Sequence, residues 1–175
     1  MAAMRKPLVT AALLAASLSA SAAPAHEHGA ARLDVAVEPS RVVFMLELPL
    51  DSLLGFERAP RTDAERKAAD VAIARLRDAG ALFRVDPAAG CKLERVELRS
   101  GALSLGGAAT STDGHDDLDA TFEFACTQAQ KAGFAEIGLF AALPRLQRVD
   151  VQAVTRKGQM KATLKRPTTR LSLAR

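Results

Sequence analysis

Three histidines are the residues of this 175-residue sequence whose types and spacing best suit chemistry. His26 and His28 flank a glutamate in a His-Glu-His-Gly run, and His115 lies in the acidic run Asp-Gly-His-Asp-Asp. Imidazole nitrogen and carboxylate oxygen are good ligands for Zn²⁺, which takes three or four of them at about 2.0–2.2 Å. Because side chains alternate along an extended chain, His26 and His28 would lie on one side of it.

A joint zinc site requires these two segments to approach each other. Asp117 follows His115 by two residues and would add a carboxylate ligand or orient the imidazole ring. The site forms only if the N-terminal segment lies near the start of a strand expected over residues 118–126. The alternative is that both segments are simply solvated and hold no metal.

The first 25 residues follow the pattern of a secretory signal peptide. Arg5 and Lys6 precede the apolar run 8–18, and small residues follow it. The apolar run is shorter than the roughly 20 residues that a membrane-spanning helix needs. We therefore expect a chain exported to the periplasm without a membrane span, with a signal peptide over residues 1–25 and one domain over residues 26–175.

Two cleavage positions fit the small residues, and they differ in the metal chemistry that they allow. If His26 became the N-terminus, its amine, two backbone amides and His28 in third position would suit square-planar Cu²⁺ or Ni²⁺. Cleavage before Ala23 would instead place Pro24 among the required amides, and proline has no N–H to give up. Both positions remain open from the sequence.

Export also bears on the two cysteines, Cys91 and Cys126. In an oxidising compartment two cysteines favour a disulfide, which would close a loop of 35 residues and stabilise the fold by about 3–4 kcal/mol. The alternative is a pair of metal thiolates, for which the usual C-x-x-C spacing is missing.

Other function classes receive little support. The sequence has no G-x-S-x-G, no glycine-rich phosphate loop and no H-E-x-x-H, so we expect no enzyme. Aromatic residues make up 4%, all of them Phe, which argues against stacking on nucleic acid bases. The net charge of +4 falls to +2 if the signal peptide, with Arg5 and Lys6, is removed. A nucleic acid partner is therefore not expected.

Alternating apolar residues predict strands, and one amphipathic stretch predicts a helix. The strands are expected at residues 32–38, 41–48, 92–100, 118–126, 135–139, 149–153, 160–164 and 171–173. A capping box of Thr62 and Glu65 opens the helix, which is expected to run from Asp63 to Ala79 and to stop at Gly80. The predicted fold is α+β: a mainly antiparallel sheet with one covering amphipathic helix and one disulfide.

The C-terminal hairpin is basic. Its cations are Arg156, Lys157, Lys161, Lys165, Arg166 and Arg170. We favour a solvated face on which edge lysines prevent aggregation, and the alternative is a site for an anionic surface.

Several short motifs, in a fixed order, match a known family. They are His26-Glu27-His28-Gly29, Leu33-Asp34-Val35-Ala36-Val37-Glu38, Glu47-Leu48-Pro49-Leu50-Asp51, Gly55-Phe56-Glu57, Gly90-Cys91, His115 before Phe122-x-Phe124-x-Cys126, Leu139-Phe140 before Pro144, and Leu171-Ser172-Leu173. With this set the chain resembles an exported proteobacterial family, long filed as a domain of unknown function, that includes a zinc-regulated periplasmic zinc-binding protein.

The resemblance implies a periplasmic role in zinc homeostasis, either holding Zn²⁺ or passing it to a metal-uptake component. By position, the ligands that it implies are His26, His28 and His115, with Asp117 weaker. Without the metal, the chain would be a non-catalytic periplasmic protein-interaction module.

Two departures from the family limit the expected capacity for zinc. Many members carry a long His/Asp-rich stretch before the strand that contains the second cysteine. In this chain the corresponding stretch is short and covers residues 110–117. The family usually has a histidine after Gly-Phe-Glu, where this chain has Arg58. A guanidinium cation cannot ligate Zn²⁺, so a site that uses this position is lost.

Overall fold

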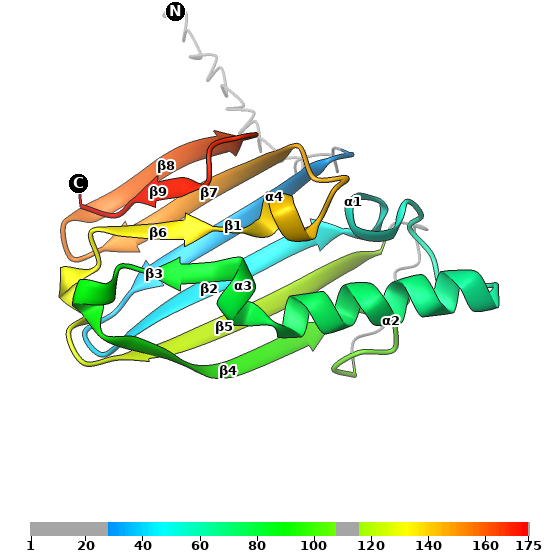
Figure 1. The fold of residues 1–175 in the computed structure, drawn as a ribbon, viewed down its shortest axis with the longest axis horizontal. Coiled ribbons are helices and arrows are strands. Elements are labelled where there is room, and N and C mark those ends of the chain that lie inside the picture. The colour runs from blue at the N-terminus through cyan, green and yellow to red at the C-terminus, as the bar shows by residue number, and fades with distance from the viewer. Residues whose placement is uncertain (1–27, 108–115, 175) are drawn as a thin grey trace, which may run out of the picture.

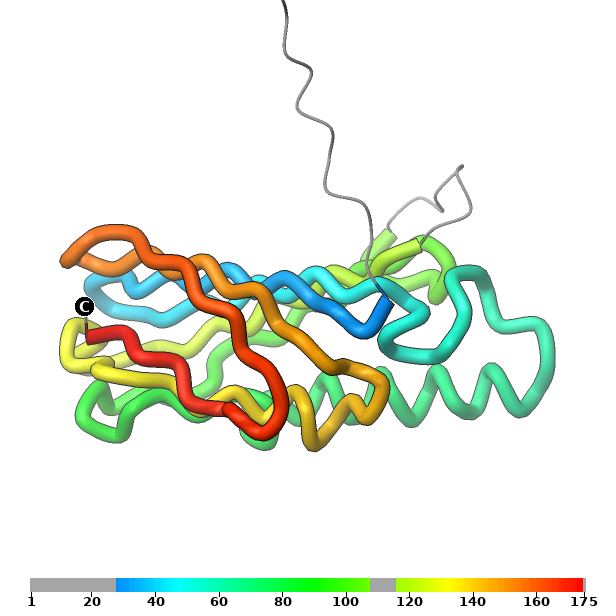
Figure 2. Tube along the Cα trace, turned by 90° about the horizontal axis from the view of Figure 1, so that it is seen from above, coloured from blue at the N-terminus to red at the C-terminus, as the bar shows by residue number. Residues whose placement is uncertain are grey.

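The computed structural model describes residues 28–107 and 116–174, which form two packed layers (Figures 1 and 2). One layer is a six-stranded sheet in the order β4-β5-β2-β1-β7-β8. Its strands are β1 (Ala30–Val37), β2 (Arg41–Pro49), β4 (Cys91–Arg99), β5 (Asp117–Cys126), β7 (Arg148–Thr155) and β8 (Gly158–Lys165). The predicted α+β class and the mainly antiparallel sheet are confirmed.

The second layer combines a small sheet with helices. The small sheet has the order β3-β6-β9, with β3 at Phe83–Val85, β6 at Phe134–Ile137 and β9 at Arg170–Ser172. The helices are α1 (Leu50–Leu54), α2 (Asp63–Arg77), α3 (Ala79–Leu82) and α4 (Leu139–Ala142), with 3₁₀ turns η1 (Pro87–Ala89) and η2 (Ala129–Lys131). In Figure 2, α2 lies in the same layer as the small sheet and continues it along one side.

The core lies between the layers because the long strands alternate as their sequence predicts. In β2, the apolar side chains at 42, 44, 46 and 48 are buried, whereas Met45 and Glu47 lie on the outer face of the large sheet. Phe83 of the small sheet stacks on Phe44 with ring centroids 4.5 Å apart and lies 4.8 Å from Phe122. These rings join the two sheets.

Most neighbouring strands pair antiparallel, with one exception at the centre of the large sheet. β1 forms an antiparallel hairpin with β2, and on its other side it pairs parallel with β7, with Ala30 beside Arg148. β7 continues into the hairpin with β8 that the sequence predicts. The expected edge strand near Leu171 is β9, which extends the small sheet.

The helix α2 begins as predicted and ends earlier. The capping box of Thr62 and Glu65 is present in full. The predicted end at Gly80 is wrong, because the helix closes at Arg77 and Asp78 leaves helical geometry at φ −81° and ψ 65°. Gly80 then lies inside the short helix α3, where Ala79 and Leu82 turn into the core.

The predicted disulfide is confirmed. Cys91 and Cys126 face each other at one end of the β4–β5 pair, with their sulfurs 2.05 Å apart. Neither cysteine is free, which removes the alternative of a thiolate metal site.

Candidate metal centre

His28 lies two residues before β1, an inner strand of the large sheet, at the end of the sheet where β1 begins and α1 follows β2. Its side chain is 72% exposed, and its Nδ1 lies 2.7 Å from a carboxylate oxygen of Asp51 in α1. We call the group formed by His28, Asp51, Ser52, Asp116 and Asp117 the metal corner. It draws on three segments that are distant in the sequence.

The chain reaches this corner because β2 runs directly into α1. Leu50 is fully buried and fixes the start of the helix. Its backbone N–H donates a hydrogen bond to the carbonyl oxygen of Asp116 at 3.1 Å, and Pro49 pairs with Asp117 across the sheet. The start of β5 is therefore held beside the helix that carries Asp51.

Ser52, the next residue of α1, holds the backbone that follows His28. Its buried hydroxyl accepts a hydrogen bond from the Gly29 N–H at 2.9 Å and donates one to the carbonyl oxygen of Ala30 at 3.3 Å. The carbonyl oxygen of Gly29 accepts from the N–H groups of Gln147 and Arg148 at 2.7 and 3.0 Å. Gly29 has φ +74°, a conformation in which glycine is not strained.

The pairing of Asp51 with His28 was missed by the sequence analysis. The two residues are 23 positions apart and meet only because the β1–β2 hairpin brings both of its open ends together. Local spacing gives no signal of such a contact. A bond from Nδ1 to a carboxylate fixes the ring orientation and leaves Nε2 as the nitrogen available to a metal, as is common for histidine ligands.

Of the four predicted ligands, the described part of the chain contains two. Asp117 pairs with Pro49, one residue before α1, and His28 contacts Asp51 within that helix, while His26 and His115 lie outside the described residues. Within residues 28–107 and 116–174, no group of three or more His, Cys, Asp or Glu side chains is close enough to hold a metal ion. The described residues therefore supply one imidazole, oriented by the carboxylate of Asp51.

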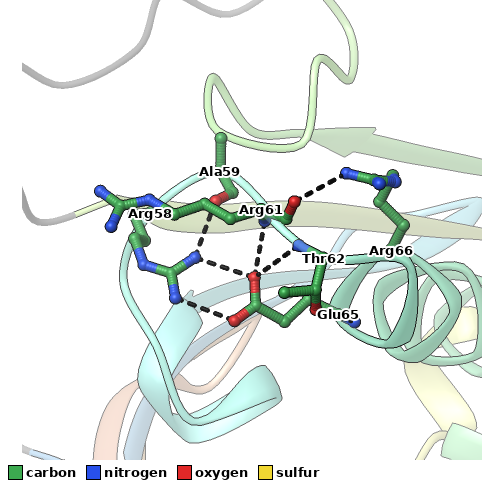
Figure 3. A network of polar contacts seen from close by, with 6 residues as sticks. All are labelled: Arg58, Ala59, Arg61, Thr62, Glu65 and Arg66. Carbon is green, nitrogen blue, oxygen red and sulfur yellow. Dashed lines mark hydrogen bonds and ion pairs between the residues drawn. The ribbon is translucent and has the colours of Figure 1, made fainter.

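Arg58, which stands where the family usually has histidine, has a structural role (Figure 3). Its guanidinium forms a bidentate ion pair with Glu65, with both N···O distances at 2.9 Å, and it lies over the ring of Phe56. Glu65 also accepts hydrogen bonds from the N–H groups of Arg61 and Thr62 at 2.6 and 3.4 Å. The ion pair first, and then these backbone bonds, lower the pKa of Glu65 to about 2.

Two further carboxylates face each other on the outer face of the large sheet. Glu47 and Asp119 are directly opposite on β2 and β5, and Glu47 also bonds to Arg32 at 3.0 Å. Partial burial, and next the charge of Glu47, raise the pKa of Asp119, while Arg99 acts in the opposite direction. Because Glu47 is engaged by Arg32, this pair offers little to a metal.

No helix within the described residues is long and apolar enough to cross a membrane.

No curated protein matches the chain significantly. The model of a family described as ZrgA family zinc uptake protein matches residues 25–173, which span both layers of the fold and the metal corner. The match covers well over half of the sequence and agrees with the resemblance seen in its motifs. The chain belongs to the ZrgA family of zinc uptake proteins.

Proposed function

We propose that this protein is a periplasmic, non-catalytic zinc-binding protein that holds Zn²⁺ or delivers it to a metal-uptake component. The observation that carries the proposal is the hydrogen bond between His28 and Asp51, which orients an exposed imidazole at the edge of the fold. Neutral imidazole oriented by a carboxylate is a common zinc ligand. The zinc-related role of the family supplies the identity of the metal.

The remaining ligands in this proposal are His26 and His115, with Asp117 as a weaker one. His26 precedes His28 by two residues, and His115 is bonded directly to Asp116, whose carbonyl oxygen is fixed to the start of α1. In the sequence, both histidines are thus within two residues of a described residue of the metal corner. With so few ligands, a single Zn²⁺ per chain is the expected capacity.

Export into an oxidising compartment is the second part of the proposal. The Cys91–Cys126 disulfide supports it, because structural disulfides are rare in reducing compartments. The predicted signal peptide lies outside the described residues.

Zinc titration by calorimetry tests the binding proposal. The protein is exported with its own signal, tagged at the C-terminus and stripped with a chelator. We expect one Zn²⁺ per chain, loss of the signal in His28→Ala, and affinity reduced about 10–100-fold in Asp51→Ala, since that variant releases the oriented ring. Asp70→Ala, an exposed carboxylate on α2, is the matched control and should bind as the wild type does.

A flat titration of folded, disulfide-bonded protein would contradict zinc binding. The chain would then be the non-catalytic interaction module. If the wild type does bind Zn²⁺, equal losses of affinity in Asp51→Ala and Asp70→Ala would place the metal away from this corner.

A further inference from the structure

A basic cavity lies at the end of the large sheet opposite the metal corner. It has a volume of about 490 Å³ and sits where β1 ends, beside the β7–β8 turn, η2 and the C-terminal segment. Its lining includes the apolar residues Val37 and Leu173 and the cations Lys131, Arg156 and Lys157. The eight residues of β1 separate the two sites by roughly 25 Å, at about 3.3 Å per residue.

The cations of the basic cavity have no acidic partner. No Asp or Glu is among the described residues that line it. Lys157 donates to the carbonyl oxygen of Ala174 at 2.8 Å, and within the described chain neither Lys131 nor Arg156 forms an ion pair. The carboxylate of Asp86 lies beside Gly133 but accepts the N–H groups of Ala88 and Gly133 at 3.0 and 3.1 Å.

Other cations of the C-terminal hairpin region are used by the fold. Arg166 donates to the carbonyl oxygens of Leu143 and Leu146 at 3.1 and 3.0 Å. Arg170 pairs with Glu136 at 3.2 Å and lies over the ring of Phe134. Within the described residues, Lys131, Arg156 and Lys157 instead line one cavity and have neither an ion pair nor a ring contact.

We propose that the basic cavity binds a phosphate-type anion. Three cations brought together from η2 and the β7–β8 turn repel one another, and an anionic oxygen group placed among them relieves that repulsion. Arginine and lysine side chains are the usual ligands of such groups, and the Thr155 hydroxyl lies in the same lining. The anion is either a free phosphate or the headgroup of an anionic lipid.

Titration followed by amide chemical shifts in ¹⁵N-labelled protein tests this proposal. The two probes are inorganic phosphate and small phosphatidylglycerol vesicles, with phosphatidylcholine vesicles as the neutral reference. We expect saturable changes at residues 130–133 and 155–157, with affinity reduced about tenfold or more in a Lys131→Ala/Arg156→Ala variant. The matched control removes the same charges from α2, as Lys67→Ala/Arg77→Ala, and should bind as the wild type does.

Each outcome decides the proposal. Saturation by inorganic phosphate identifies a free anion as the ligand, and a response to phosphatidylglycerol vesicles alone identifies a lipid headgroup. No saturable change with either probe, or an equal loss in the α2 control, overturns the site in favour of a general basic surface. Melting temperatures of both double variants verify folding, and since the altered residues are exposed we expect them to stay near the wild-type value. The result is independent of the zinc proposal, because no residue of the metal corner lines the basic cavity.

Discussion

The hydroxyl of Ser52 makes one hydrogen bond as acceptor, from Gly29, and one as donor, to Ala30. At the scale of single residues, Ser52 holds the backbone of the residue next to His28, and Asp51 holds the imidazole of His28 itself. Two adjacent residues of α1 thus hold two adjacent residues of the N-terminal segment.

We expect Ser52→Ala to lower the free energy of unfolding by about 1–3 kcal/mol, because it leaves the partly buried N–H of Gly29 without its acceptor. Urea denaturation measures the change. Ser100→Ala is the matched control, since the hydroxyl of Ser100 is buried and has no hydrogen-bond partner in the described structure. A Ser52→Ala variant as stable as Ser100→Ala would show that the two bonds contribute nothing.

The limits of sequence reasoning at the residue scale are visible at Asp51 and Arg58. Histidines are rare enough here to be singled out by type, but their partners depend on which strand ends meet. Asp51 is one carboxylate among many until the β1–β2 hairpin brings it to His28. The sequence did show that Arg58 cannot be a ligand, whereas its bidentate pairing with Glu65 became visible only in the fold.

At the scale of elements, the strands were predicted well, with the exception of β3, but their division into two sheets was not. In strands of eight to ten residues the alternation of apolar and polar side chains repeats several times. The capping box marks the start of α2 unambiguously. Two strands of the small sheet, β6 and β9, were expected near residues 135–139 and 171–173, whereas the three-residue strand β3 is too short for a period to stand out. Without β3, the pairing that makes a second sheet was not foreseen. The end of α2 predicted at Gly80 was wrong, because the helix already ends at Asp78.

The start of α2 should be sensitive to acid through Glu65. Its pKa of about 2 in the folded protein lies below the ordinary value of 4.5, so the ionised carboxylate stabilises the fold. This contribution is present above pH 4.5 and is lost progressively as the pH falls from there towards 2. Glu65→Gln should therefore lower the melting temperature at pH 6 and show a smaller further decrease between pH 5 and 3 than the wild type. If the melting temperatures of the two proteins fell equally between pH 5 and 3, the lowered pKa of Glu65 would be contradicted.

The Cys91–Cys126 disulfide stabilises the β4–β5 pair. We expect a Cys91→Ser/Cys126→Ser variant to lose about 3–4 kcal/mol of unfolding free energy, since the unfolded chain regains the entropy of an open loop. Urea denaturation measures the loss, and thiol counting of the native wild type should find no reactive thiol. Two reactive thiols in the native protein would refute the disulfide.

At the scale of the whole molecule, we expect the mature N-terminus to decide whether the protein can bind Cu²⁺ or Ni²⁺. N-terminal sequencing of the exported protein should find a chain that begins at Ala23 or His26. A start at His26 predicts square-planar Cu²⁺ or Ni²⁺ binding, seen as a visible absorption band on titration, whereas a start at Ala23 predicts no such band, because Pro24 supplies no amide. A start at Met1 would contradict export with cleavage.

The two proposed sites lie at opposite ends of β1, one at its start and the other at its end. If the basic cavity rests against an anionic surface, the metal corner is turned away from that surface and remains open to a partner. The two proposals together thus predict an orientation for the molecule, although each can fail without the other.

The parallel pairing of β1 with β7 sets the order in which the protein can be assembled. The first strand of the chain lies in the middle of the large sheet, and Arg148, the partner of Ala30, comes 118 positions later in the sequence. Contacts over such long stretches of chain slow folding, because loop closure comes before any stabilising contact. The carbonyl oxygen of Gly29 also finds its hydrogen-bond donors only in Gln147 and Arg148, at the start of the same late segment. The backbone next to His28 therefore gains its full set of hydrogen bonds only after β7 has paired with β1, although the contact between His28 and Asp51 needs the β1–β2 hairpin alone.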